Sequence, residues 1–211
     1  MLSNRTGNAS GRLRRYLPSA ERKQEILEAA LQEFSAHGYV STTMERIAAR
    51  VGLTKGGVYA HYRSKEEIFE DLLTWLLAPP NIDATWSVRE GESLPQIVDS
   101  YLDHIYGKLN DPAVLATFRL ILAESARMPD LLQQWAARML EPLWARDQAL
   151  VDACVNNGKM RRSVLTDNFI LAGSPAIFGA ILQILFAERS PISMAKTRAT
   201  HRKLLLEILQ P

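Results

Sequence analysis

The chain has 211 residues, which is long enough for one large domain or two small ones with a hydrophobic core. Hydrophobic residues make up 47% of it and charged residues 23%, and the longest near-apolar stretch, 176–187, is shorter than the roughly 20 residues of a membrane span. This composition argues against a membrane-spanning protein, and the single cysteine, Cys154, excludes an intramolecular disulfide and suits a reducing cytoplasm.

The formal net charge of +2 hides an asymmetry between the two ends of the chain. Residues 1–65 carry 11 Lys and Arg against 5 Asp and Glu, whereas the remainder carries 14 against 18. A basic surface confined to one end is typical of nucleic-acid binding, because neutralised phosphates release condensed counterions. Residues 1–18 hold four arginines, no acid and no apolar core segment, which predicts a flexible basic arm and leaves a transit peptide open as the alternative.

Four helices are predicted in the first third of the chain, at about 19–37, 43–51, 54–62 and 64–78. Ser19 is the expected N-cap of the first helix, and Gly38 and Gly52 are expected to end the first and second. Ser64 with Glu67 three residues later has the spacing of a capping box at the start of the fourth. Two prolines then end this helical region.

Residues 79–93 are rich in Pro, Asp, Ser and Gly and mark the expected seam between domains. Beyond them, helical patterns occupy 94–109, 112–127, 130–156, 167–187 and 195–209, and no period-two alternation persists. Pro142 and Pro175 lie inside these patterns, so a kink or break is expected at each. The predicted fold is therefore all-α, with an arm at 1–18 and domains at 19–65 and 66–211.

Two short helices joined by a tight turn are expected within residues 43–62. Ala48 is small where the second helix crosses the first, Gly52 suits a turn with positive φ, and Val58 can pack the second helix back onto the first. The spacing Ala-x3-Gly-x5-Val fits a helix-turn-helix, although a pattern this loose is frequent by chance.

The residues around this motif carry a denser match: Ile26-Leu27-x-Ala29-Ala30, Gly38-Tyr39-x2-Thr42-Thr43-Met44-x2-Ile47-Ala48, Val51-Gly52-Leu53-Thr54-Lys55-Gly56-Gly57-Val58-Tyr59 and His61-Tyr62-x-Ser64-Lys65-Glu66. Over residues 21–73 the chain resembles the TetR family of bacterial regulators. The resemblance implies a three-helix DNA-binding domain followed by a larger helical domain that binds a ligand and dimerises. Ala60 departs from the aromatic or His of many relatives, so the base preference is expected to differ.

Seven residues are expected to contact DNA: Thr43, Thr54, Lys55, Gly56, Tyr59, His61 and Lys65. Lys55 can reach a phosphate or a guanine edge from the start of the second short helix, and Gly56 allows close approach. Thr43 can combine its hydroxyl with helix N-terminal amides around a phosphate. For Tyr59 and His61 the assignment depends on the resemblance, since a lone histidine is more often a surface or core residue; Tyr62 is expected in the core.

A ligand pocket is expected among large and adaptable side chains of the second domain, with a few polar anchors: His104, Phe118, Arg119, Glu124, Met128, Trp135 and Met139. For each of these residues ordinary core packing remains the alternative. The apolar content of the last two long helices fits either an internal core or a four-helix dimer interface, and the resemblance favours the homodimer.

The expected function is that of a cytoplasmic transcriptional repressor, released from a palindromic double-stranded operator by a small, largely apolar effector. The alternative is a DNA-binding regulator or architectural protein without a ligand. An enzyme is not expected, because the four histidines lack metal-ligand spacing and no nucleophile elbow or phosphate-binding glycine loop occurs. No cofactor, metal ion or membrane is expected as a partner.

Overall fold

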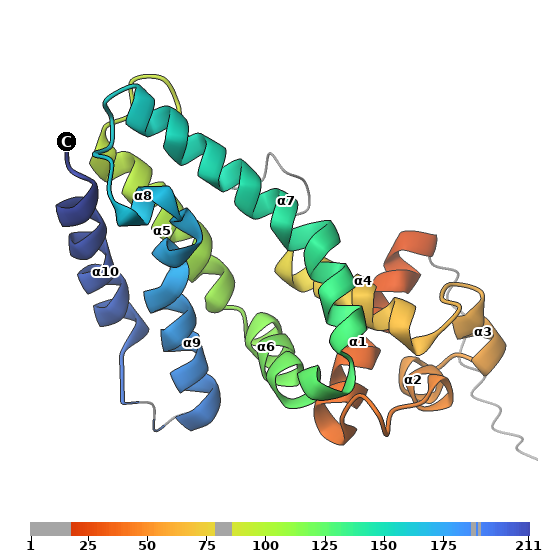
Figure 1. Cartoon of the computed structure of the whole chain (residues 1–211). Helices are drawn as coiled ribbons and strands as arrows, with labels where there is room; N and C mark the ends of the chain where they lie inside the picture. Colours follow the sequence, from red (N-terminus) through yellow and green to blue (C-terminus); the bar gives the residue numbers. More distant parts are fainter. Residues whose placement is uncertain (1–17, 79–85, 187–188, 190) are drawn as a thin grey trace, which may run out of the picture.

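The computed structural model describes residues 18–78, 86–186, 189 and 191–211, so the predicted basic arm and most of the predicted seam lie outside the described residues. No strand occurs among the described residues, as the all-α prediction requires (Figure 1). The helices are α1 (Ser19–His37), α2 (Met44–Val51), α3 (Lys55–Tyr59), α4 (Lys65–Leu77), α5 (Leu94–Leu109), α6 (Pro112–Glu124), α7 (Pro129–Asn156), α8 (Val164–Asp167), α9 (Ser174–Phe186) and α10 (Met194–Leu209), with 3-10 helices η2 (Ser125–Arg127) and η3 (Phe169–Gly173).

The N-terminal unit, helices α1–α3, and the following helix α4 begin where the capping signals predict, with one exception. Thr43, Thr54 and Ser64 are the N-caps of α2, α3 and α4, and each side chain accepts a hydrogen bond from a backbone amide of the first turn. Ser19 is instead the first helical residue of α1, because Pro18 occupies the N-cap position and provides no side-chain acceptor. The apolar stripe of α1 is buried against α2 and α4.

Gly52 makes the turn between the two short helices possible. Its φ of 74° and ψ of 28° are left-handed, a region that costs little only for a residue without Cβ. Its amide donates to the carbonyls that end α2. Ala48 and Val58 are both buried beside this turn, as the helix-turn-helix pattern predicts.

Helices α5–α10 form the larger C-terminal unit, in which the break expected at Pro175 occurs and a break at Pro142 does not. Pro142 lies inside the 28-residue α7, which continues through it, so no break occurs there. A proline removes one intrahelical hydrogen bond, and α7 is held on both sides of it by buried Trp135 and Val151. Pro175 falls in the first turn of α9, so the single helix predicted for 167–187 is divided into η3 and α9.

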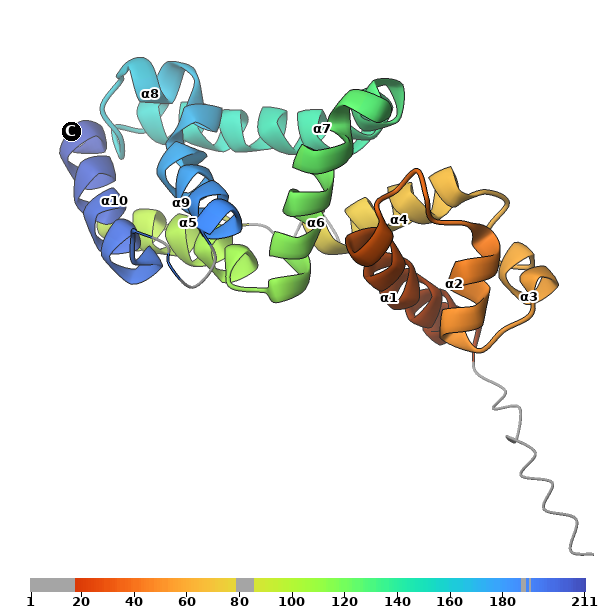
Figure 2. The same ribbon diagram turned by 90° about the horizontal axis from the view of Figure 1, so that it is seen from below.

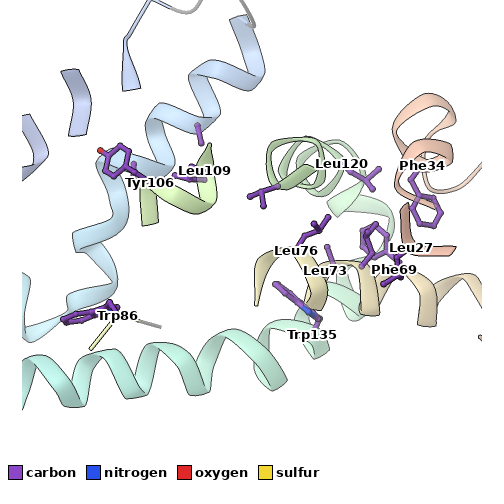
Figure 3. Close-up of a cluster of buried hydrophobic side chains, with 14 of the residues drawn as sticks. Leu27, Phe34, Phe69, Leu73, Leu76, Trp86, Tyr106, Leu109, Leu120 and Trp135 are labelled. Carbon is purple, nitrogen blue, oxygen red and sulfur yellow. The ribbon is translucent and has the colours of Figure 1, made fainter. Parts of the chain in front are cut away.

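Helix α4 joins the two units. Figure 2 shows α1–α3 at one end of the molecule and α5, α9 and α10 at the other, with α4 beside the α6 and α7 helices between them. Phe69 points from α4 toward Phe34 of α1, with ring centroids 5.6 Å apart, while Leu73 and Leu76 lie near Trp135 of α7 (Figure 3). One helix therefore contributes side chains to the packing of both units.

One segment corrects the expectation that no apolar run approaches the length of a membrane span. Residues 169–186 form an 18-residue window with a mean hydropathy of 2.0, of which 33% is buried within the protein. By length and composition alone this window could cross a bilayer. The window begins with the 3-10 helix η3. Several apolar side chains of α9 remain exposed, and they form a face that another molecule could cover.

Candidate functional site

The helix-turn-helix presents the start of α3 and the start of α2 to solvent. Thr54 accepts from the amide of Gly57 at 3.1 Å, and Thr43 accepts from the amide of Arg46 at 3.4 Å. Both hydroxyls therefore fix the helix N-termini, whose remaining amides are oriented for an anion. At Gly56 a Cβ would meet no atom within 4 Å, so this position faces open space at the exposed surface.

Lys55 and Tyr59 lie together on this surface. The Lys55 ammonium is 5.7 Å from the centre of the Tyr59 ring, and the tyrosine is 44% exposed. His61, two residues further, is half-buried, whereas Tyr62 is buried as predicted for a core residue. The exposed members of the predicted set are thus Thr43, Thr54, Lys55, Gly56 and Tyr59.

An acidic residue missed by the sequence analysis lies beside this surface. Glu45 of α2 pairs with Lys55 of α3 at 2.5 Å between Oε1 and Nζ. The hydrogen bond from Lys55, together with hydrogen bonds from the backbone amide of Glu45 and from the Thr43 side chain, lowers the pKa of Glu45 to about 2. Lys55, which the sequence predicts to contact DNA, is therefore already paired with a carboxylate.

Lys65 occupies a position that differs from the expected phosphate contact. Its Nζ donates to the carbonyl oxygens of Tyr39, Val40 and Thr42 at 2.7, 3.3 and 3.0 Å, and it lies 4.3 Å from the centre of the Tyr39 ring. All three N–H groups of the ammonium are engaged. Burial lowers the pKa of Lys65. The residue closes the turn that leads into α2, and its contact with DNA stays a prediction.

A second acidic residue that the sequence analysis missed connects α1 to α2. Glu33 is 4% exposed and accepts from Arg46 Nε at 2.9 Å and from Arg50 Nε at 2.5 Å. The hydrogen bonds from these two arginines hold the pKa of Glu33 below its usual value. The signal available in the sequence was its place on the apolar stripe of α1, three residues after Ala30. Arg46 and Arg50 therefore connect α2 to α1 through Glu33.

The predicted ligand pocket is divided between two cavities. The first, here called the apolar cavity, measures about 340 Å³ and lies among α5, α6, α7 and the end of α4, with Phe118 and Trp135 in its wall. Lys108 is the one charged residue among its described lining residues. The ring N–H of Trp135 donates at 3.1 Å to Oγ1 of Thr74, a residue 61 positions earlier in the sequence.

The second, here called the junction cavity, measures about 420 Å³ and lies between α1, α6 and α9. Arg119 and Glu124 line it, and a Cβ on Gly38 would meet Glu124 Oε1 at 2.9 Å. The predicted set therefore does not converge on one pocket.

The other three predicted pocket residues, His104, Met128 and Met139, line neither cavity. Met128 is buried, and Met139 packs half-buried against the core, so the alternative of core packing accounts for both. Burial lowers the pKa of His104, which favours its neutral form.

The last two helices carry an exposed apolar face. Phe178, Leu185 and Phe186 of α9 are 61%, 66% and 49% exposed, and Leu204 of α10 is 44% exposed. Leu205 and Leu209, in contrast, are buried inside the subunit. The apolar residues of these helices thus form part of the internal core and also an exposed apolar face, and the dimer interface stays a prediction.

No group of three His, Cys, Asp or Glu side chains within the described part of the chain is placed to hold a metal ion. The arrangement of exposed helix N-termini, a lysine and a tyrosine has the chemistry of a phosphate and base-edge contact.

Two family models match the chain in succession. Residues 26–72 match the model of bacterial regulatory proteins of the tetR family, and residues 92–164 match that of the C-terminal domain of AefR-like transcriptional repressors. The chain belongs to the TetR family. Members of the TetR family are transcriptional regulators and not enzymes, in agreement with the expectation from the sequence.

The chain is similar to HTH-type transcriptional regulators of other bacteria over part of its length. It is 42% identical over 59 residues to the HTH-type transcriptional regulator YhgD of Bacillus subtilis, covering 28% of this chain and 31% of YhgD. It is 33% identical over 86 residues to SrpR of Pseudomonas putida, covering 41% and 40% of the two chains. The matches thus span less than half of the length of these two relatives.

The whole fold, in contrast, is shared with solved structures. A TetR-family regulator from Mesorhizobium loti superposes with a TM-score of 0.69 over 92% of this chain and 99% of the other, at 23% identity. Such a likeness, at 23% identity, identifies the helical fold.

Proposed function

We propose that the chain is a cytoplasmic transcriptional repressor that binds a palindromic operator as a homodimer and leaves it when a small, largely apolar effector occupies the apolar cavity. The observation that carries the DNA-binding part is the exposed face formed by Thr43, Thr54, Lys55 and Tyr59 at the starts of α2 and α3. Two such faces in a dimer would read half-sites about 34–36 Å apart.

The exposed apolar face of α9 and α10 supports the dimer. It is formed by large side chains on two long helices, and a second copy could cover it as a four-helix interface related by a twofold axis. The face lies at the end of the molecule away from α3 (Figure 2). The two reading units would then stand apart, as a palindromic site requires.

The apolar cavity supports the effector. Its volume of about 340 Å³ falls within the range of small-molecule sites, and almost all of its lining is aliphatic or aromatic. It is bordered by the C-terminal end of α4, whose first residue, Lys65, donates to the turn that leads into α2. A ligand there could favour a conformation in which the two reading units no longer match the operator.

Selection of bound fragments from genomic DNA, followed by footprinting, tests the proposal. We expect a protected near-palindrome, bound less tightly by Lys55→Ala and by Tyr59→Phe. Lys159→Ala, which removes a lysine remote from α3, is the matched control and should bind as the wild type does. Equal binding by all four proteins would contradict the proposed reading face.

Thermal-shift screening against apolar and aromatic compounds tests the effector. A ligand at 100 times its dissociation constant stabilises a protein by about 2.7 kcal/mol, which is readily measured. A protein that binds the operator but no compound across a broad library would support the alternative, a DNA-binding regulator without a ligand.

A further inference from the structure

One charged residue, Lys108 of α5, is among the described lining residues of the apolar cavity, and its ammonium lies at the end of α4 that borders the cavity. The surrounding wall is formed by side chains such as Leu109, Phe118, Leu132 and Trp135. Within the described part of the chain no carboxylate forms an ion pair with this lysine, and burial lowers the pKa of its ammonium. A half-buried cation beside an apolar cavity interacts strongly with an anion, because the effective dielectric constant there is low.

The same ammonium holds the end of α4. Lys108 Nζ donates to the carbonyl of Ala78 at 3.0 Å and more weakly to that of Leu77 at 3.5 Å. These carbonyls belong to the last turn of α4, where helix geometry leaves no intrahelical partner and where the helix dipole favours a cation. Lys108 therefore caps the helix that reaches from the cavity to the DNA-binding unit.

We propose that the effector carries an acidic head group on an apolar body, and that its carboxylate takes the Lys108 ammonium away from the carbonyls of α4. This rests on the proposed function, in which the apolar cavity is the effector site. A charge-assisted hydrogen bond to a carboxylate is stronger than one to a neutral carbonyl, so the acidic ligand wins the competition for the donor. A neutral ligand of the same shape fills the cavity and leaves the cap in place.

The two parts of the ligand would then have different roles. The apolar body supplies affinity by burial against the cavity wall. The acidic head supplies the signal, because α4 loses its C-terminal cap only when the head is present. Thermodynamic reciprocity then requires that operator DNA, which needs α4 in its capped position, weakens the binding of the acidic ligand and leaves that of the neutral ligand unchanged.

Three probes with one chain length and different heads separate these effects: decanoate, 1-decanol and decyltrimethylammonium. The full-length wild type is compared with Lys108→Met, which keeps the apolar stem, and with Lys108→Arg, which keeps the charge. Lys159→Met is the matched control, since Lys159 also donates to a backbone carbonyl, that of Arg89 at 3.2 Å, but does not line the cavity. Tryptophan fluorescence reports binding through Trp135, and the anisotropy of labelled operator DNA reports release.

We expect decanoate to bind the wild type about tenfold more tightly than 1-decanol, with the cation weakest. The preference should vanish in Lys108→Met and persist in Lys108→Arg and Lys159→Met. Decanoate should release operator DNA from the wild type, and saturating 1-decanol should not.

Equal affinity of the wild type for decanoate and 1-decanol would overturn the proposal, as would a preference that survives in Lys108→Met, release by both ligands, or the failure of all three probes to bind. None of these outcomes contradicts the proposed function if the protein binds operator DNA and some other compound releases it. The proposed function fails separately, if no DNA fragment is selected or if Lys55→Ala binds as the wild type does.

Discussion

Glu45 and Lys55 face each other across the helix-turn-helix, with 2.5 Å between carboxylate and ammonium. The pair joins α2 to α3 on the side proposed to meet DNA. The Glu45 carboxylate therefore binds the ammonium that a DNA phosphate would contact. DNA binding must therefore displace Glu45 or tolerate its charge.

The first prediction concerns this pair. Glu45→Gln should bind operator DNA about threefold more tightly than the wild type, because it removes a negative charge near the phosphates and frees Lys55. Fluorescence anisotropy at several salt concentrations measures both the affinity and its salt dependence. Glu90→Gln, which removes an exposed carboxylate outside the N-terminal unit, should leave both quantities at the wild-type values. Weaker binding by Glu45→Gln would mean that the pair positions Lys55 for its contact.

A second prediction concerns the connection between α1 and α2. Glu33→Gln should lower the free energy of unfolding by about 2 kcal/mol at neutral pH, because a buried carboxylate loses its charge-assisted bonds from Arg46 and Arg50. The pKa of Glu33 is lowered in the folded state, so its contribution is present above the unfolded pKa and is lost as the pH falls through the folded value.

Urea titration at a series of pH values measures this difference. The curves of wild type and Glu33→Gln should converge at low pH, where the carboxyl group is protonated in the folded and unfolded states alike. A difference that is independent of pH would show that the charge of Glu33 contributes nothing.

The third prediction separates two roles for Lys65. If the ammonium serves the carbonyls of Tyr39, Val40 and Thr42, Lys65→Met lowers both stability and operator affinity but leaves the salt dependence of binding unchanged. Lys55→Met should reduce that salt slope by about one, as expected for the loss of a phosphate contact. A reduced slope in Lys65→Met as well would restore the role expected from the sequence.

A fourth prediction tests the face of α9. Leu185→Asp should convert the proposed dimer to a monomer in sedimentation velocity, because it would bury a charge without a partner at the proposed twofold interface. Operator affinity should fall with it, since each subunit then binds one half-site. Leu122→Asp is the control: Leu122 is also exposed, at 52%, but lies on α6. A dimer that survives in Leu185→Asp would place the interface elsewhere.

Local signals in the sequence predicted most of the fold. The glycine that ends α2, the hydroxyl caps and the helical periodicity each act over a few residues, so they can be read without the tertiary structure. The exposed members of the DNA-binding set follow from the same motif. Pro142 shows the limit of such signals, because packing on both sides keeps α7 continuous through a helix-breaking residue.

The remaining features depend on partners that are distant in sequence. Lys65 meets carbonyls more than 20 residues before it, and Lys108 meets the end of α4 30 residues before it. Neither contact produces a periodic pattern in the sequence from which it could be predicted. The predicted pocket was divided for the same reason, since Phe118 and Arg119 are neighbours in sequence but face two different cavities on opposite sides of α6.

Because α4 contributes Phe69 to the cluster around Phe34 and Thr74 Oγ1 as the acceptor for the ring N–H of Trp135, neither unit has a complete core without it. The subunit should therefore melt in one cooperative transition, with equal calorimetric and van't Hoff enthalpies, and an excised N-terminal fragment that ends before α4 should be unfolded. A compound bound far from the DNA would then protect the reading helices from heat as effectively as it protects its own surroundings.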